Sequence, residues 1–256
     1  MTDRSNVKSA QRVLDILQLF AERRRPATLA DLSRELDLPK SSCLALLQTL
    51  QSNGFLYQFE TDGSYYPTGK WLTSAHSIAT HDPVVPRARP VLEKIHASSG
   101  ETVCLAKRSH FNVVYLDVVE SNQLLRYAAE AGQARPLHCS ASGQALMAGM
   151  EAGERDALIA RLSLEKVAAH TITSHAALSR KVIAGAARGW VSNIGEYRAD
   201  TAGVAVPVPM NGNIYAVVVA APSHRLEGVI ERTAKMLIAA CKPLADRIDP
   251  RVAATA

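Results

Sequence analysis

The sequence predicts an α+β protein in two parts, in which three short helices and a hairpin precede a larger part with antiparallel strands. Three observations support this prediction. Apolar residues recur at helical spacing near the N-terminus, a glycine-containing turn then separates two aromatic-rich segments, and a proline-rich stretch precedes longer strand-like segments. At 256 residues, 47% of them hydrophobic, the chain has enough apolar material for two cores.

The first predicted helix begins at Val7. Its apolar residues lie three and four positions apart and form one buried stripe: Ala10, Val13, Leu14, Leu17 and Phe20. The helix should end before Pro26, because proline cannot continue it, and the arginines at 23–25 suit the negative end of a helix. Thr28 is then expected to cap a second helix over 29–36.

The third predicted helix starts at Pro39 and ends near Asn53-Gly54. Its inward positions are apolar: Cys43, Leu46, Leu47 and Leu50. Segments 55–59 and 64–66 then flank Glu60-Thr61-Asp62-Gly63, a pattern typical of a hairpin. Three helices followed by a hairpin predict a winged helix-turn-helix.

A winged helix predicts double-stranded operator DNA as a partner, because its third helix can enter the major groove with its N-terminus foremost. The residues expected to contact DNA are short polar residues at the start of this helix, outward residues further along it, and two flanking residues: Lys40, Ser41, Ser42, Leu44, Ala45, Gln48, Arg12 and Thr28. Gln48 suits adenine and Ala45 a thymine methyl group. Further phosphate-contact candidates are Arg23, Arg24, Arg25, Arg34 and Lys70. Two alternatives remain open, namely a docking or dimerisation role for the module and a merely solvated helix end for the arginine run.

The prolines at 83, 86 and 90 follow a predicted helix over 70–81 and indicate a domain boundary. We therefore expect a DNA-binding domain over 1–75, a linker helix over 76–95 and a second domain over 96–256. Strands are predicted at 102–107, 113–119, 124–129, 204–209 and 214–221. Helices are predicted at 91–98, 142–150, 154–162, 176–188 and 226–244.

The chain resembles the IclR family of bacterial regulators over nearly its whole length. The N-terminal resemblance rests on Leu36-Asp37-Leu38-Pro39-Lys40-Ser41-Ser42 and Asn53-Gly54-Phe55-Leu56, although family members commonly carry arginine at the position of Ala45. The C-terminal resemblance rests on ordered segments, among them Gly100-Glu101-Thr102-Val103, Arg135-Pro136-Leu137-His138, Ser140 to Leu146, Arg188-Gly189-Trp190 and Gly195-Glu196-Tyr197. The resemblance implies a GAF-like effector-binding domain, a small organic acid as effector, and a homo-oligomer that is a dimer or a tetramer.

The resemblance also implies where the effector would bind. The implied residues are Ala141, Ser142, Asn193, Gly203, Val218 and Ala220. Backbone N–H groups at the helix start near Ala141 and Ser142 would hold a carboxylate. The family usually has aspartate at the position of Asn193, cysteine at Gly203 and small hydroxyl residues at Val218 and Ala220, so this pocket should be less polar and suit an apolar or aromatic acid with one carboxylate.

Three further residues were considered as effector contacts. Arg126 and Arg135 are alternative carboxylate partners, although residues that flank strands more often face solvent. His138 is interpreted as a half-buried histidine whose hydrogen bonds are satisfied within the protein.

The sequence gives little support to an enzyme or a metal protein. No nucleophile elbow or phosphate-binding loop occurs, the four cysteines are far apart, and His170 and His175 are the nearest histidine pair. We expect no catalytic residue, metal or cofactor, and, without a signal peptide or membrane span, a cytoplasmic protein. The net charge of +5 suits a polyanionic partner. A ligand-responsive regulator is the favoured function, and the alternatives are a small-molecule enzyme with an appended winged helix and an interaction module that does not bind DNA.

Overall fold

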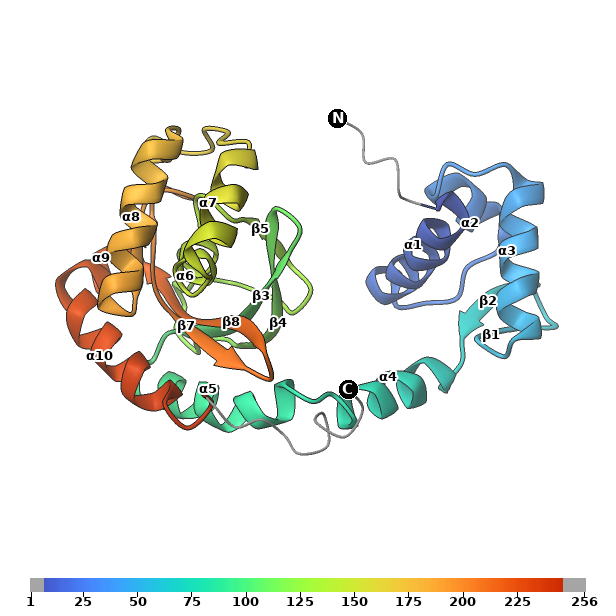
Figure 1. The fold of residues 1–256 in the computed structure, drawn as a ribbon. Coiled ribbons are helices and arrows are strands. Elements are labelled where there is room, and N and C mark those ends of the chain that lie inside the picture. Colours follow the sequence, from blue (N-terminus) through green and yellow to red (C-terminus); the bar gives the residue numbers. More distant parts are fainter. Residues whose placement is uncertain (1–6, 246–256) are drawn as a thin grey trace. The chain divides into compact units, whose positions relative to one another are not determined.

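The computed structural model describes residues 7–245, and the chain divides between Asp82 and Pro83 into two compact units (Figure 1). The expectation about a signal peptide concerns residues that lie partly outside this range. The first unit contains three helices, a two-stranded hairpin and a fourth helix: α1 (Lys8–Arg23), α2 (Leu29–Glu35), α3 (Lys40–Ser52), β1 (Leu56–Gln58), β2 (Tyr65–Pro67) and α4 (Lys70–Thr80). The predicted order of a winged helix-turn-helix is confirmed.

Local sequence determines the ends of the first two helices. The N–H of Arg24, in a left-handed conformation, donates to Phe20 O at 3.0 Å and ends α1. Thr28 begins α2 with a capping box, because its Oγ1 accepts from Asp31 N at 3.2 Å while its own N–H donates to Asp31 Oδ2 at 3.3 Å. The helices then pack around one apolar core, with Ile16, Phe20, Leu32, Cys43, Leu47 and Leu56 buried.

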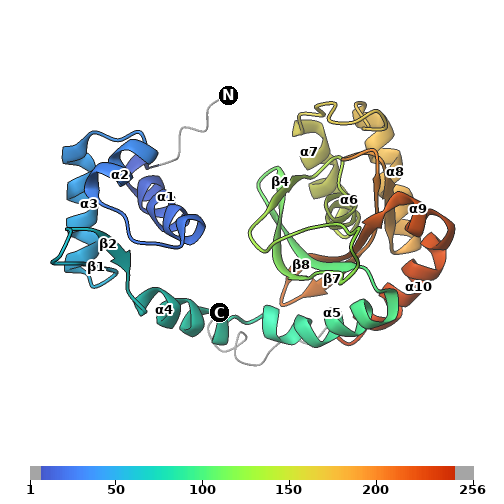
Figure 2. The ribbon, with the colours of Figure 1, turned by 180° about the vertical axis from the view of Figure 1, so that it is seen from behind.

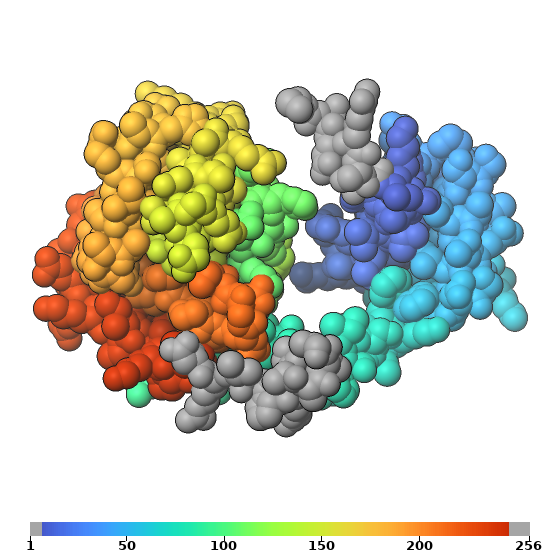
Figure 3. Space-filling model, in the orientation of Figure 1, coloured from blue at the N-terminus to red at the C-terminus, as the bar shows by residue number. Residues whose placement is uncertain are grey.

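The second unit is a six-stranded antiparallel sheet with helices on both faces, which confirms the α+β prediction (Figure 2). The strand order is β5-β4-β3-β8-β7-β6. Its elements are α5 (Val85–Ser99), β3 (Thr102–Ser109), β4 (Asn112–Val119), β5 (Ala134–Pro136), α6 (Ala141–Ala148), α7 (Ala152–Arg161), α8 (His175–Arg188), β6 (Val191–Ile194), β7 (Thr201–Met210), β8 (Asn213–Pro222), α9 (Ser223–Leu226), η1 (Glu227–Val229) and α10 (Ile230–Cys241). Helices α8 and α10 lie at the outer surface of this unit (Figure 3).

Alternation along the strands gives the sheet two different faces. Val103, Leu105, Val217 and Val219 face the core that contains α5 and α10. The alternate positions face α6 and are smaller on average: Cys104, Ala106, Ala216, Val218 and Ala220. Small side chains on this face allow α6 to approach the sheet closely.

Gly143 permits a second close approach, between the first turn of α6 and the segment before it. A Cβ atom at this position would lie 2.3 Å from Leu137 O and 2.6 Å from Leu137 Cα. No side chain fits there, so glycine fixes the distance between the start of α6 and the chain that leads into it.

Several predicted elements are corrected. Residues 124–129 form no strand, whereas β5 and β6, which were not predicted, close the two edges of the sheet. Residues 76–95 belong to two helices, α4 and α5, with a break at 81–84, rather than to one linker helix. α5 begins six residues before the predicted start at 91, because Pro86 lies in its first turn, where the missing N–H costs no helical bond. The helix predicted over 226–244 is interrupted by η1.

Within residues 7–245, no helix is both long enough and apolar enough to cross a membrane.

Candidate effector and DNA-binding sites

Helix α3 presents a polar outer face at its N-terminus. Lys40, Ser41 and Ser42 are exposed, as are Ala45 and Gln48 further along the helix, whereas Leu44 is half-buried. Cys43, Leu47 and Leu50 are buried and hold the opposite face against the core. Pro39 supplies no side-chain cap, so the first N–H groups of α3 lie at the exposed, positively polarised end of a helix.

The other residues predicted to contact DNA differ in whether their side chains already form contacts within the protein. Thr28 has its N–H and its hydroxyl engaged with Asp31, so we interpret it as the residue that sets the start of α2. Arg23 is half-buried and forms salt bridges with Asp31 and Glu35, which makes it a structural residue. Lys70 donates to Asn53 O at 2.7 Å and lies over the Phe55 ring. Arg24 and Arg25 are exposed, and Arg12 is half-buried.

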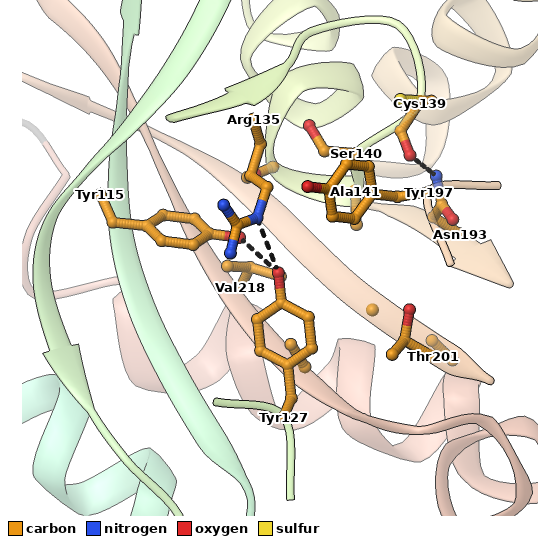
Figure 4. Close-up of a pocket in the computed structure, with 14 residues that line it drawn as sticks. Tyr115, Tyr127, Arg135, Cys139, Ser140, Ala141, Asn193, Tyr197, Thr201 and Val218 are labelled. Atoms are coloured by element: carbon orange, nitrogen blue, oxygen red, sulfur yellow. Dashed lines mark hydrogen bonds between the residues drawn. The ribbon is translucent and has the colours of Figure 1, made fainter. Parts of the chain in front are cut away.

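In the second unit, one pocket contains all six residues that the resemblance implied. Empty space of about 360 Å³, partly open to solvent, lies between β4, β5, the start of α6, β6, β7 and β8 (Figure 4). The lining residues are Tyr115, Tyr127, Arg135, Cys139, Ser140, Ala141, Ser142, Asn193, Tyr197, Thr201, Ala202, Gly203, Val218 and Ala220.

Helix α6 points its N-terminus into this pocket. Ser140 caps the helix, because its Oγ accepts from Gly143 N at 3.2 Å. The Ser142 hydroxyl is buried and has no hydrogen-bond partner, and within residues 7–245 the N–H groups of Ala141 and Ser142 have none either. A buried hydroxyl without a partner costs free energy, so this end of the pocket favours a ligand that accepts hydrogen bonds.

Asn193 lines the pocket, but the protein backbone already engages both ends of its amide. Nδ2 donates to Cys139 O at 2.8 Å, and Oδ1 accepts from Glu196 N at 3.3 Å. The Glu196 carboxylate in turn pairs with Lys181 and accepts from Gln144 Nε2 at 2.8 Å. Asn193 therefore joins the start of α6 to the loop after β6.

The Cys139 thiol beside this network is neutral at neutral pH. Burial, together with the charge of Glu196, raises the pKa of Cys139 to about 12. The pocket therefore holds no thiolate that would repel an acidic ligand.

Three of the implied residues form a small apolar wall opposite the start of α6. Gly203 on β7 pairs with Ala220 on β8, and Val218 lies two residues before Ala220 on the same face of the sheet. A Cβ atom at position 203 would lie 3.0 Å from the Ala141 Cβ, so glycine preserves the space between the wall and α6.

The aromatic side of the pocket was not predicted from the sequence. Arg135 lies between the rings of Tyr115 and Tyr197, with its Cζ 5.6 Å and 5.3 Å from the two centroids, and its Nε donates to Tyr127 Oη at 3.1 Å (Figure 4). The expectation that Arg135 faces solvent is therefore corrected. The available signal was the alternation in β4, which places Tyr115 on the same face as the buried Val113.

The other two residues considered as effector contacts lie outside this pocket. Arg126 pairs with Glu120 at 3.0 Å. His138 is buried, with its Nε2 2.9 Å from Glu165 O, in agreement with the interpretation that its hydrogen bonds are satisfied within the protein.

Comparison with known proteins decides the family. A domain model described as the IclR helix-turn-helix domain matches residues 9–59, and one described as the bacterial transcriptional regulator IclR C-terminal domain matches residues 76–249. The chain belongs to the IclR family. It is 30% identical over 228 residues to the probable transcriptional regulator SauR of Cupriavidus necator, covering 88% of this chain and 90% of that protein.

Solved structures of IclR proteins share this fold. The IclR structure from Thermotoga maritima superimposes with a TM-score of 0.80 at 20% identity, covering 95% of this chain and 99% of that one. An IclR homologue from Microbacterium hydrocarbonoxydans, in complex with 4-hydroxybenzoate, gives a TM-score of 0.73 at 25% identity, covering 96% and 100%. This IclR protein is therefore a DNA-binding transcriptional regulator with a ligand-binding C-terminal domain, and not an enzyme.

Proposed function

We propose that this regulator binds its operator as a homo-oligomer, a dimer or a tetramer, and changes its operator affinity when a small organic acid enters the pocket of the second unit. The controlled genes would form a catabolic operon that handles this acid. The carboxylate of the effector lies at the start of α6, and the body of the effector packs against Gly203, Val218 and Ala220.

One observation carries the effector proposal, namely the buried Ser142 hydroxyl that lacks a partner beside the N–H groups of Ala141 and Ser142. A carboxylate accepts hydrogen bonds only, and the positive end of α6 favours its charge. Tyr115, Tyr127 and Tyr197 add apolar surface for the body of the acid, whether it is aromatic or aliphatic.

The DNA proposal assigns two roles to α3. Lys40, Ser41 and Ser42 contact phosphates at the start of the helix, together with Arg12 on α1 and with Arg24 and Arg25 directly after α1. Leu44, Ala45 and Gln48 face the base edges, and Thr28 contributes through the position of α2. The exposed positions of Lys40, Ser41, Ser42, Ala45 and Gln48 support this division.

The oligomer proposal rests on apolar side chains that the first unit leaves in solvent. Leu14 on α1 is 57% exposed, and Leu72 and Ile78 on α4 are 75% and 73% exposed. Apolar surface of this kind is typical of contacts between subunits. Light scattering coupled to size-exclusion chromatography measures the oligomeric state directly.

The test of the effector proposal combines ligand binding with operator binding. Full-length protein is screened by thermal shift against carboxylic acids, with 4-hydroxybenzoate as the aromatic member, and each ligand that raises Tm is added to a gel-shift assay with the DNA upstream of the gene. Ser142→Val should abolish the ligand response and leave operator binding unchanged, and Ser109→Ala, at an exposed serine outside the pocket, is the control. A response that survives Ser142→Val would place the effector elsewhere.

A further inference from the structure

Among the lining residues within the described range 7–245, Arg135 alone carries a charge. We propose that Arg135 binds a second acidic group, so that the effector is a short dianion, with one acid at the start of α6 and the other at this guanidinium. The inference rests on the proposed effector function and specifies the ligand class of the same pocket.

The guanidinium of Arg135 has hydrogen-bond donors to spare. An arginine carries five N–H donors. Within residues 7–245, three hydrogen bonds use them, from Nε to Tyr127 Oη at 3.1 Å, from one terminal nitrogen to Ala134 O at 2.9 Å, and from the other to Gln133 Oε1 at 2.8 Å. Two N–H groups, one on each terminal nitrogen, are left for an acceptor.

No acid neutralises this charge within residues 7–245, since every contact of the Arg135 guanidinium is with a neutral group. Arg225 and Arg89 are also half-buried, and each of them is paired with a carboxylate. Arg225 binds both oxygens of Glu101 at 2.6 and 2.8 Å, and Arg89 binds Asp117 at 2.9 Å. A partly buried charge without a counter-ion is unfavourable, so the pocket is electrostatically incomplete until an anion enters it.

The tyrosines hold the guanidinium in place without neutralising it. Tyr115 and Tyr197 contact it through their ring faces, and Tyr127 accepts a hydrogen bond from Nε (Figure 4). These contacts restrict the side chain before a ligand arrives, which lowers the entropic cost of binding. The unused N–H groups lie in the guanidinium plane, where a carboxylate binds arginine.

The two anion-binding groups belong to the same small pocket. Arg135 is the middle residue of β5, six residues before Ala141, and the Ser142 hydroxyl without a partner lies in the first turn of α6. The apolar wall at Gly203, Val218 and Ala220 suits a short carbon chain between the two acids.

Matched pairs of diacids and their monoamides test this inference, because a monoamide keeps the size of the diacid and removes one charge. The probes are malonate, succinate and glutarate, each with its monoamide, titrated calorimetrically into the full-length protein. For the best-fitting pair we expect the diacid to bind roughly ten- to a hundredfold more tightly than the monoamide. Arg135→Gln should reduce this ratio to near one, and Arg135→Lys should keep part of it.

The control is Arg126→Gln, which removes an exposed arginine outside the pocket and should leave the ratio unchanged. Thermal unfolding of each variant shows whether it is folded. If Arg135→Gln does not fold, the diacid-to-monoamide affinity ratio of Arg135→Lys tests the inference instead. Equal affinities for diacid and monoamide, an unchanged ratio in Arg135→Gln, or no binding of any diacid would each overturn the inference. If the diacid inference fails but a monocarboxylate still changes operator binding through Ser142, the proposed effector function stands without the diacid inference.

Discussion

Two helices of this protein carry serine in their first turn and differ in their surroundings. Helix α3 starts with Lys40, Ser41 and Ser42 in solvent, whereas α6 starts with Ala141 and the buried Ser142 beside a pocket. Each helix start is the positive end of a helix dipole. The exposed one suits a long polyanion, and the enclosed one suits a small acid, so packing rather than local sequence determines the size of anion each can bind.

The largest expected effect concerns the packing that encloses the start of α6. Gly143→Ala would place a methyl group 2.3 Å from Leu137 O, so the first turn of α6 must move. We expect the free energy of unfolding of the second unit to fall by about 3 kcal/mol or more, measured by urea denaturation. The matched control is Gly153→Ala on α7, where nothing lies within 4 Å and alanine should be neutral or stabilising. Equal stability of the two variants would contradict the close approach.

A smaller effect is expected where Asn193 is tied to the residue before the cap of α6. Asn193→Asp would replace the Nδ2 donor by a carboxylate oxygen facing Cys139 O, near the charge of Glu196. We expect a loss of about 1–3 kcal/mol at neutral pH, measured by thermal unfolding.

The pH dependence of the stability of Asn193→Asp distinguishes the loss of the hydrogen bond to Cys139 O from a general packing defect. The new carboxyl should have a folded-state pKa above its unfolded value, so the loss should be smallest in acid and should grow as pH rises through that range. Asn122→Asp, at an exposed asparagine, is the control and should show neither effect. A loss that is independent of pH would contradict the assigned contact.

Substitutions at the exposed start of α3 should change DNA binding rather than stability. Lys40→Ala is expected to weaken binding to operator and unrelated DNA alike, by roughly tenfold at moderate salt, and to lower the salt slope by about one, because one phosphate contact is lost. Fluorescence anisotropy with labelled duplexes measures both quantities, and Lys235→Ala on α10 is the control. Gln48→Ala should instead change the preference among operator variants; identical effects of the two substitutions would show that α3 does not divide these roles.

The smallest effect is expected at the cap that positions α2. Hydrogen bonds from the Thr28 side chain and backbone lower the pKa of Asp31. The ionised carboxylate therefore contributes stability above its unfolded pKa of about 4, and this contribution is lost as pH falls through the lower folded value. Asp31→Asn should make the first unit slightly less stable at neutral pH, and the difference should shrink as pH falls below about 4, measured by thermal unfolding. A stability difference that does not shrink in acid would contradict the capping role of Asp31.

The sequence predicted the first unit more completely than the second, because the signals in the first unit are local. Thr28 with Asp31 sets one helix start, and the buried stripe of α3 sets its orientation. β5 has only three residues and contains Pro136, which lacks a ladder donor, so no alternation was visible there, and the apolar residues at 124–125 suggested a strand instead.

The pocket, too, could be predicted from the sequence only in part. The family resemblance implied six residues that the structure places around one space, yet it gave no indication that the amide of Asn193 is engaged by backbone on both sides. The inward direction of Arg135 depends on three tyrosines that come from distant segments. Contacts of this kind follow from the tertiary fold and leave no local pattern.

The distance between positions 203 and 141 also has an evolutionary consequence. A Cβ atom on residue 203 would lie 3.0 Å from the Ala141 Cβ, so the two positions share a fixed space. A side chain at 203, such as the cysteine usual in the family, therefore requires either a small displacement of the start of α6 or a smaller residue at 141. An alignment of relatives should therefore show positions 141 and 203 changing together. Such paired changes would replace part of the apolar wall of the pocket by a functional group.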